Sequence, residues 1–358
     1  MPARADSPLL PFNRKYLGSK RLLRAWIADR ICEAAPGGPS GRPPASVLDG
    51  FCGTGALTVE LAARGTSRIV AVDSLVSNCV ILRGWAAAAR IDAGRAVAFL
   101  AEMNASDPAR GYISESYAGT YFTAENCARM DAVREIIAAR AAAGDLSPDE
   151  HDYLLASFLL AADRVANTLG QYDAFLKHIG SDSVVEGRHL RDQRVRSSFR
   201  LRPLAVGPGA EITVLAGDLL ALAAGIRVDA AYYDPPYNGR QYCDNYHVLE
   251  NIARWEKPAL SGKTRKFDRT GLRSPFSRRA DAARALQKLV QDTPARHVFL
   301  SYSSEGILSR ETIRAILELQ GTVREWEFPY PVFGNGAGVS ARRSLTELLF
   351  HLRKGQGA

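Results

Sequence analysis

The chain has 358 residues, of which 46% are hydrophobic and 23% are charged, and this composition excludes disordered and collagen-like proteins. Its length exceeds one minimal domain, so we expect one large or two fused globular units. The formal net charge of +8 favours an anionic partner.

The cysteines and the N-terminus indicate the compartment. The five cysteines are well separated, with no CxxC pair and no histidine at metal-ligand spacing, so we expect a reduced, intracellular protein without a metal site. The opening MPARADSPLLPF is broken by an acid and prolines before an apolar core can form, and no later apolar run has membrane-spanning length. Secretion and membrane insertion are therefore disfavoured.

The first part of the chain predicts alternating helices and strands. A helix is expected over residues 19–34, followed by a connector rich in proline and glycine at 35–45. Two apolar runs, 46–51 and 68–73, then enclose a glycine-rich turn and a helical pattern. A further helix is expected over 78–90. This β-α-β rhythm predicts a parallel sheet.

The rhythm changes over residues 95–205, where long helical patterns occupy 123–143 and 148–167 without strand-like alternation. The sequence Ser-Pro-Asp-Glu that starts at Ser147 is a capping box with proline at the first helical position, which fixes the start of the second helix. We interpret this region as a mainly helical insertion.

Strand-like runs resume at 211–218, 229–234 and 297–303. The chain closes on two further runs, 323–330 and 346–354, which are expected to pair as an antiparallel edge. The whole pattern predicts a Rossmann-like α/β fold.

Basic residues cluster in three segments. Residues 13–24 contain five basic residues and no acid, residues 188–202 contain six and one acid, and residues 254–279 contain nine and two acids. These segments together carry a charge of +17, so the rest of the chain totals −9. Clustered charge of this kind is a candidate footprint for nucleic acid.

A glycine-rich turn at residues 49–55 lies where a strand meets a helix, and Asp73 follows at the end of the next strand. Glycines let the backbone approach a ligand closely, and an acid at that spacing can bind two ribose hydroxyls. A purely structural turn, NAD, FAD and S-adenosylmethionine all remain open. Thr58 replaces the third glycine of the dinucleotide pattern, and Asp49 suits a cationic methionine moiety better than a pyrophosphate, which favours S-adenosylmethionine.

A second motif, Asp234-Pro235-Pro236-Tyr237, follows the apolar strand and so projects from the carboxyl end of the sheet, where such folds bind ligands. The prolines stiffen the turn. Tyr237 can stack on a planar base while the Asp234 carboxylate and the Pro235 carbonyl accept hydrogens from an exocyclic amine. This arrangement favours direct attack of the amine on a sulfonium methyl group. The alternative is a structural Pro-Pro turn.

With these motifs in place, the sequence resembles the adenine-specific DNA methyltransferases of the Dam and FokI-methylase type over nearly the whole chain. The segments that carry the resemblance are KYLGSK (15–20), LDGFCGTG (48–55), VDSL (72–75), GDLL (217–220) and DPPY (234–237). Leu219 stands where the family often has phenylalanine. The segments closest to the FokI-methylase branch are YFTAEN (121–126), ANTLGQYDAFLK (166–177), NGRQYCDNYHVLENIARW (238–255) and SYSSEG (301–306).

The resemblance implies a methyltransferase core of residues 1–94 and 206–358, with residues 95–205 as a target-recognition insertion. It implies transfer of a methyl group from S-adenosylmethionine to the N6 amine of a flipped adenine in a short duplex DNA site. Asp234 and Pro235 would activate the amine, Pro236 would stiffen the turn and Tyr237 would stack on the base. The implied cofactor residues are Tyr16, Gly18, Lys20, Asp49, Phe51, Gly53, Gly55, Asp73 and Asp218.

Several further side chains are candidates for contact with double-stranded DNA. They are Lys177, Arg194, Arg196, Arg200, Tyr242, Asn245, Lys263, Arg265 and Lys266. His247 is either a DNA contact or structural. Tyr242, Asn245 and Tyr246 follow the Asp234–Tyr237 turn and are expected to help shape the pocket or to fill the hole left by the flipped base. Asn167, Gln171, Tyr172, Lys177 and His178 have a composition suited to base edges on one helix end, or form a solvated helix face. The three tryptophans Trp26, Trp85 and Trp255 are expected in the core.

Alternatives remain within and outside enzyme chemistry. The same turn could methylate the amine of cytosine, or adenine in RNA, and the fold could also serve a non-catalytic DNA-binding regulator. The chain has no Pro-Cys dipeptide, which argues against methylation of the cytosine ring. We expect a bacterial, cytoplasmic, nucleoid-associated protein, a monomer or weak dimer, with a cognate restriction endonuclease as a possible partner.

Overall fold

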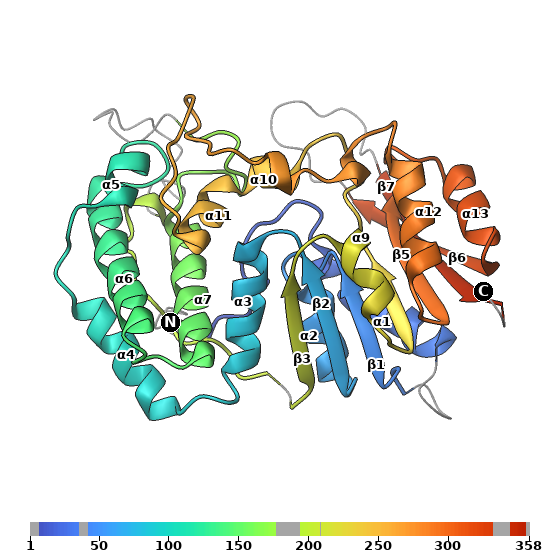
Figure 1. Ribbon diagram of the computed structural model, residues 1–358, viewed down its shortest axis with the longest axis horizontal. Helices are drawn as coiled ribbons and strands as arrows, with labels where there is room; N and C mark the ends of the chain where they lie inside the picture. Colours follow the sequence, from blue (N-terminus) through green and yellow to red (C-terminus); the bar gives the residue numbers. More distant parts are fainter. Residues whose placement is uncertain (1–6, 36–41, 177–193, 208, 332–343, 356–358) are drawn as a thin grey trace.

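In the computed structural model of the protein, seven strands form one central sheet in the order β3-β2-β1-β4-β5-β7-β6 (Figure 1). The structure describes residues 7–35, 42–176, 194–207, 209–331 and 344–355. The strands are β1 (Ser46–Gly50), β2 (Arg68–Asp73), β3 (Glu211–Ala216), β4 (Ala230–Tyr233), β5 (His297–Ser303), β6 (Gly321–Pro331) and β7 (Ser344–Lys354). The predicted α/β fold and all of its predicted strands are confirmed.

Strands β1 to β5 are parallel, whereas β7 pairs antiparallel with β5 and β6. The predicted antiparallel pairing of the last two strands is confirmed, but β7 is inserted beside β5, so β6 alone forms that edge of the sheet. The order of strands reverses between β1 and β4, which are neighbours in the sheet. Open α/β sheets bind ligands at such a switch point, outside the carboxyl ends of the strands.

Helices cover both faces of the sheet. One face packs against α1 (Arg24–Ala34), α2 (Ala56–Ala63) and α3 (Val76–Ala87), and the other against α9 (Leu219–Leu222), α12 (Ala282–Asp292) and α13 (Arg310–Glu318). Alternate strand residues serve the two layers: Val47 packs toward α1 and α2, whereas Leu48 packs toward α12. The helix expected over 19–34 is divided into a 3-10 helix, η1 (Lys20–Leu22), and α1.

A helical region lies beside α3 at one end of the sheet (Figure 1). It contains α4 (Ala93–Ala105), α5 (Tyr112–Tyr117), α6 (Ala124–Ala142) and α7 (Pro148–Val165). The predicted capping box is confirmed, because the Glu150 amide donates to Ser147 Oγ at 3.2 Å and the Ser147 amide donates to Glu150 Oε2 at 2.9 Å. Gly84 allows α3 and α7 to approach closely, since a Cβ there would lie 2.4 Å from the Asp152 carbonyl oxygen.

Two short helices follow the DPPY turn (residues 234–237) and join the sheet to the helical region. They are α10 (Tyr242–Asn245) and α11 (His247–Arg254). The fully buried Glu250 of α11 accepts hydrogen bonds from the amides of Val76 at 3.0 Å and Ser77 at 2.9 Å, at the start of α3. The remaining 3-10 helices are η2 (Ala223–Gly225), η3 (Thr270–Leu272) and η4 (Pro275–Ser277). Among the residues with described positions, no helix combines the length and apolar character needed to cross a membrane.

Candidate active site

A cavity of about 280 Å³ opens at the carboxyl ends of β1, β2 and β4, at the switch point of the sheet. It gathers most of the predicted site residues into one lining, namely Tyr16, Gly18, Lys20, Asp49, Phe51, Gly53, Asp73, Asp218, Asp234 and Pro236. Three predicted residues are absent from the lining: Gly55, Pro235 and Tyr237. Pro235 is buried, and Lys20 Nζ lies over the Tyr237 ring, 5.5 Å from its centroid.

The glycine-rich turn has a left-handed backbone at three positions: Phe51 (φ 65°), Gly53 (φ 54°) and Gly55 (φ 70°). A Cβ on Gly53 would lie 3.3 Å from the Tyr16 ring, so glycine keeps this part of the cavity open. A Cβ on Gly55 would lie 2.6 Å from Leu82 Cδ1. Gly55 therefore serves the packing of α2 against α3, and its effect on the cavity is indirect.

Asp73 fixes the turn to the end of β2. Its Oδ2 accepts from the Gly53 amide at 2.9 Å, and its Oδ1 accepts from the Leu75 amide at 2.8 Å. Burial raises the pKa of Asp73, while the hydrogen bonds from Leu75 and Gly53 lower it. Each carboxylate oxygen retains a further lone pair. The geometry thus suits an acid that binds two hydroxyl groups of a ligand.

Asp49 is a buried acid at the end of β1, with 2% of its surface exposed. Its Oδ2 accepts from Thr58 Oγ1 at 2.6 Å, and no ion pair with a cation of the described chain is formed. Burial raises the pKa of Asp49 to about 7, although the hydrogen bond from Thr58 opposes this. A cationic ligand group beside Asp49 would remove much of the cost of burying its charge.

The Asp234 carboxylate of the DPPY turn lies in a buried ion-pair network. Lys20 Nζ is 2.7 Å from Asp234 Oδ1 and 3.3 Å from Glu347 Oε1, and Lys20 has only 7% of its surface exposed. The pKa of Asp234 is raised to about 6, because burial and the Glu347 charge raise it more than the Lys20 charge lowers it. Burial alone would lower the pKa of Lys20, but the two carboxylates raise it well above its usual value. Lys20 therefore remains charged and holds Asp234 in place.

Tyr242 of α10 and Tyr246, which lies between α10 and α11, position the KYLGSK segment (15–20). The Tyr16 ring stacks on Tyr246 with centroids 4.3 Å apart, and Tyr246 Oη accepts from the Leu17 amide at 2.6 Å. Tyr242 Oη donates to the Leu17 carbonyl oxygen at 3.2 Å. Gly18 adopts φ 73°, and a Cβ there would lie 2.8 Å from Tyr242 Oη. The close approach of Tyr242 thus requires glycine. Tyr246 contacts Tyr16 and Leu17 but does not line the cavity, so its part in shaping the pocket stays a prediction.

The family model of D12 class N6 adenine-specific DNA methyltransferases matches residues 16–316. The matched residues include 16–20 of the KYLGSK segment, the glycine-rich turn and the DPPY turn. The chain belongs to this family. The helical region lies within the matched segment as well.

Named relatives of this D12-class chain agree with the match. "Modification methylase StsI" of Streptococcus sanguinis is 32% identical over 72% of this chain and 38% of that protein. "Type II methyltransferase M.FokI" of Planomicrobium okeanokoites is 32% identical over 65% of this chain and 35% of that protein. The chain therefore spans little more than a third of these two relatives. "Type II methyltransferase M.NlaIII" of Neisseria lactamica is 30% identical over 86% of this chain and 88% of that protein.

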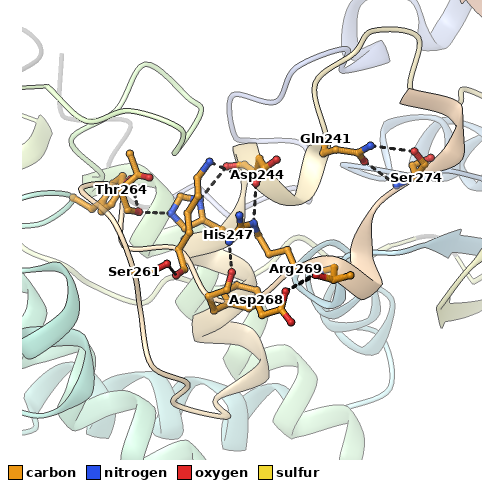
Figure 2. A network of polar contacts seen from close by, with 12 residues as sticks. Gln241, Asp244, His247, Ser261, Thr264, Asp268, Arg269 and Ser274 are labelled. Atoms are coloured by element: carbon orange, nitrogen blue, oxygen red, sulfur yellow. Dashed lines mark hydrogen bonds and ion pairs between the residues drawn. The ribbon is translucent and has the colours of Figure 1, made fainter. Parts of the chain in front are cut away.

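Residues 271–276, in the loop after α11, form part of the cavity wall. Figure 2 shows how it is fastened: Gln241 exchanges hydrogen bonds with the backbone of Ser274 at 2.8 and 3.1 Å, and the ring nitrogens of His247 lie 3.0 Å from the Asp244 carbonyl oxygen and 2.6 Å from that of Thr264. His247 is fully buried, and burial lowers its pKa to about 4. His247 is thus structural rather than a DNA contact.

Much of the charge in basic segment 254–279 is neutralised locally. Five of its nine cations form ion pairs with acids, namely Arg254 with Glu250, Lys257 with Glu135, Lys266 and Arg269 with Asp244, and Arg278 with Asp281. Lys266, predicted as a DNA contact, lies 3.5 Å from Asp244. The segment therefore presents less free charge than its composition indicates.

The other predicted DNA contacts differ in exposure. Arg196, Arg200, Lys263 and Arg265 are exposed, and Arg194 is half-buried. Lys177 lies outside the described residues, as does His178. Tyr242 lines the cavity. Asn245 has only 2% of its surface exposed, which does not favour the predicted contact with DNA. For the exposed residues, contact with DNA stays a prediction.

The prediction of base-reading side chains on one helix end is wrong for Asn167 and Tyr172. Helix α7 ends at Val165, and both residues are buried in the segment that follows. Asn167 Nδ2 donates to the carbonyl oxygens of Thr120 at 2.9 Å and Leu176 at 2.6 Å. Asn167 thus satisfies buried backbone groups, and Tyr172 Oη donates to Asp163 Oδ1 at 2.8 Å; a composition suited to base edges does not reveal such buried contacts.

The sequence-based prediction missed Glu347, which lies 3.3 Å from Lys20. One signal for it exists: a single acid interrupts the apolar run of β7, a strand with the fully buried neighbours Leu349 and Phe350. Charged residues are seldom buried unless they are paired. Of the predicted core tryptophans, Trp85 is buried, whereas Trp26 and Trp255 are half-buried.

Proposed function

We propose that the chain transfers the methyl group of S-adenosylmethionine to the N6 amine of adenine in a short site of duplex DNA. The observation that carries the proposal is that one cavity joins the glycine-rich turn, with Asp49 and Asp73, to the Asp234 carboxylate of the DPPY turn. Membership of the D12 class supports the choice of adenine in DNA.

The residues of the cavity fit this cofactor. The two oxygens of Asp73 suit its ribose hydroxyls, and the buried Asp49 suits its cationic methionine part. Asp218, at the start of α9, lines the side of the cavity expected to take its adenine ring. When bound, S-adenosylmethionine supplies a methyl group on a positively charged sulfur, which is the electrophile of the reaction.

Residues of the DPPY turn would orient the target amine. The Asp234 carboxylate and the Pro235 carbonyl accept its hydrogens and direct the nitrogen lone pair toward the methyl carbon. The nitrogen–carbon bond forms as the sulfur–carbon bond breaks, and the amine then loses one proton to the Asp234 carboxylate or to water. A strong base is not needed, in agreement with the structural role of His247.

The target adenine has to leave the DNA stack, at a cost of roughly a few kcal/mol. The Tyr237 ring would stack on the flipped base and recover part of this cost. Contacts between cations and DNA phosphates would supply the remainder.

We infer a role in restriction and modification from the relatives named as modification methylases. In this role residues 95–205 read the DNA site, a cognate endonuclease cuts the unmodified site, and the chain acts in the bacterial cytoplasm on nucleoid DNA as a monomer or weak dimer. Helices α4 to α7 supply a region of the size such recognition needs.

The test is to incubate the chain with methyl-labelled S-adenosylmethionine and bacterial DNA and to digest the product to nucleosides. Label in N6-methyl deoxyadenosine is expected, and Asp234→Ala should abolish it while DNA binding persists. Asp145→Ala, which removes an exposed carboxylate between α6 and α7, is the matched control and should retain the label. Label on cytosine, or label with Asp234→Ala, would reject the proposal.

A further inference from the structure

A second cavity of about 420 Å³ lies outside the active site. Its walls come from the N-terminal segment, the end of α7 and residues 194–202. Six basic residues line it, namely Arg14, Lys15, Arg21, Arg164, Arg194 and Arg202. The N-terminal segment is held to the neighbouring wall by backbone hydrogen bonds, from the Leu9 amide to the Pro203 carbonyl at 2.9 Å and from the Ala205 amide to the Leu9 carbonyl at 2.8 Å.

Arg14 is the buried cation of this cavity, with 8% of its surface exposed. Its Nη2 donates to Asn78 Oδ1, but its Nε and Nη1 are buried without a hydrogen-bond partner among the described residues. No carboxylate in the described chain forms an ion pair with Arg14. A buried guanidinium without a counter-ion is costly, and an anion in the cavity would offset that cost.

The one acid in the described lining, Asp163, does not neutralise the cavity. Its Oδ1 accepts from Tyr172 Oη at 2.8 Å. It forms no ion pair with a basic residue of the described lining. Burial raises the pKa of Asp163, and the charges of Arg14, Arg194 and Lys15 lower it, so these cations lie near it without direct contact. Six basic residues and one acid thus leave the described part of the lining with a net positive charge.

Arg14 connects this cavity to the active site. Its guanidinium carbon lies 4.9 Å from the centroid of the Tyr16 ring. Asn78, which accepts from Arg14, donates through Nδ2 to Tyr16 Oη at 3.0 Å. Tyr16 in turn lines the active-site cavity. A ligand bound by Arg14 would therefore lie one side chain away from the active-site cavity, on the side lined by Tyr16.

We propose that this second cavity binds a backbone phosphate of the methylated DNA strand, next to the flipped nucleotide. The inference rests on the proposed function for the identity of the strand. Arginine suits this ligand because its planar guanidinium donates two parallel hydrogen bonds to phosphate oxygens. The phosphate would hold the strand while the base leaves the stack, and the resulting contacts offset part of the cost of flipping.

The test uses Arg164→Gln, Arg194→Gln and the double variant. These side chains are less buried than Arg14 and are absent from the described lining of the active-site cavity, so the fold and the active site should be retained. Binding to a random-sequence duplex is measured at several salt concentrations in the presence of sinefungin, a cationic analogue of S-adenosylmethionine. Arg314→Gln, which removes one charge from the distant α13, is the matched control.

We expect each cavity variant to weaken binding about tenfold at low salt and to lower the slope of log affinity against log salt by about 1, with nearly additive effects in the double variant. The control should follow the wild type. Slopes that match the control would overturn the proposal. So would stabilisation of the wild type, but not of Arg194→Gln, by inorganic phosphate with unchanged DNA slopes, because the cavity would then bind a small anion and not DNA.

The methyl-transfer assay on the same samples separates this inference from the proposed function. Unmethylated DNA with lowered slopes would reject the proposed function and support the phosphate site. Methylated DNA with unchanged slopes would reject the phosphate site alone.

Discussion

Asp49 offers a quantitative test of how the cavity is built. Its pKa of about 7, compared with 3.8 in an unfolded chain, means that the charged form costs about 4 kcal/mol of folding stability at high pH. Because the pKa of Asp49 is higher in the folded state than in the unfolded state, the folded protein is more stable at low pH, where Asp49 is protonated. It loses this added stability as the pH rises through about 7. Asp49→Asn removes the titration, so the variant should gain stability relative to the wild type by about 2.5 kcal/mol between about pH 5 and pH 8.

The assay is urea unfolding of both proteins across this pH range. Asp218→Asn is the matched control, because it removes a carboxylate from the same cavity that is exposed to water. The account also predicts that Asp49→Asn binds sinefungin more weakly, since a neutral amide cannot balance a cationic ligand. A stability difference that stays constant with pH would refute the reasoning, and unchanged sinefungin affinity would remove Asp49 from the cofactor site.

Two further substitutions test neighbouring parts of the site. Glu347→Gln removes a charge that raises the pKa of Asp234; because Asp234 must be ionised to accept the amine hydrogens, the acidic limb of kcat/KM should move to lower pH, and a limb that stays in place would show that Glu347 has no influence. Gly55→Ala combines a left-handed φ with a contact of 2.6 Å to Leu82 and should cost about 3 kcal/mol in urea unfolding, whereas Gly65→Ala, with φ 97° and open space, should cost about 1; equal costs would contradict the packing role.

The sequence predicts the sheet and the position of the active site well, and the reason is physical. Buried parallel strands are continuous apolar runs such as Arg68–Asp73, and the side chains that follow them necessarily meet at one edge of the sheet. The glycine-rich turn and the Asp234 turn therefore had to converge once β1 and β4 were neighbours. Asp49 and Asp73 could be predicted for the same reason.

What could not be predicted depends on contacts between distant parts of the chain. The ion pairs of Asp244 and Glu250 neutralise cations that composition counts as free. Asn167 and Tyr172 have the polar groups of a DNA-reading surface, but tertiary packing uses them to satisfy buried groups. The second cavity joins the basic segments 13–24 and 188–202 to the end of α7. The sequence indicated both segments, and Arg194 as a DNA contact, but not that they meet.

The most direct test of the central claim is single-molecule sequencing of DNA from a host that expresses this chain, because it reports the modified base together with its context. The account predicts methyl groups on adenine N6 in one short sequence context, and none when the host expresses Asp234→Ala. Unmodified adenine in the presence of the folded wild-type chain, or modification of cytosine instead, would contradict it.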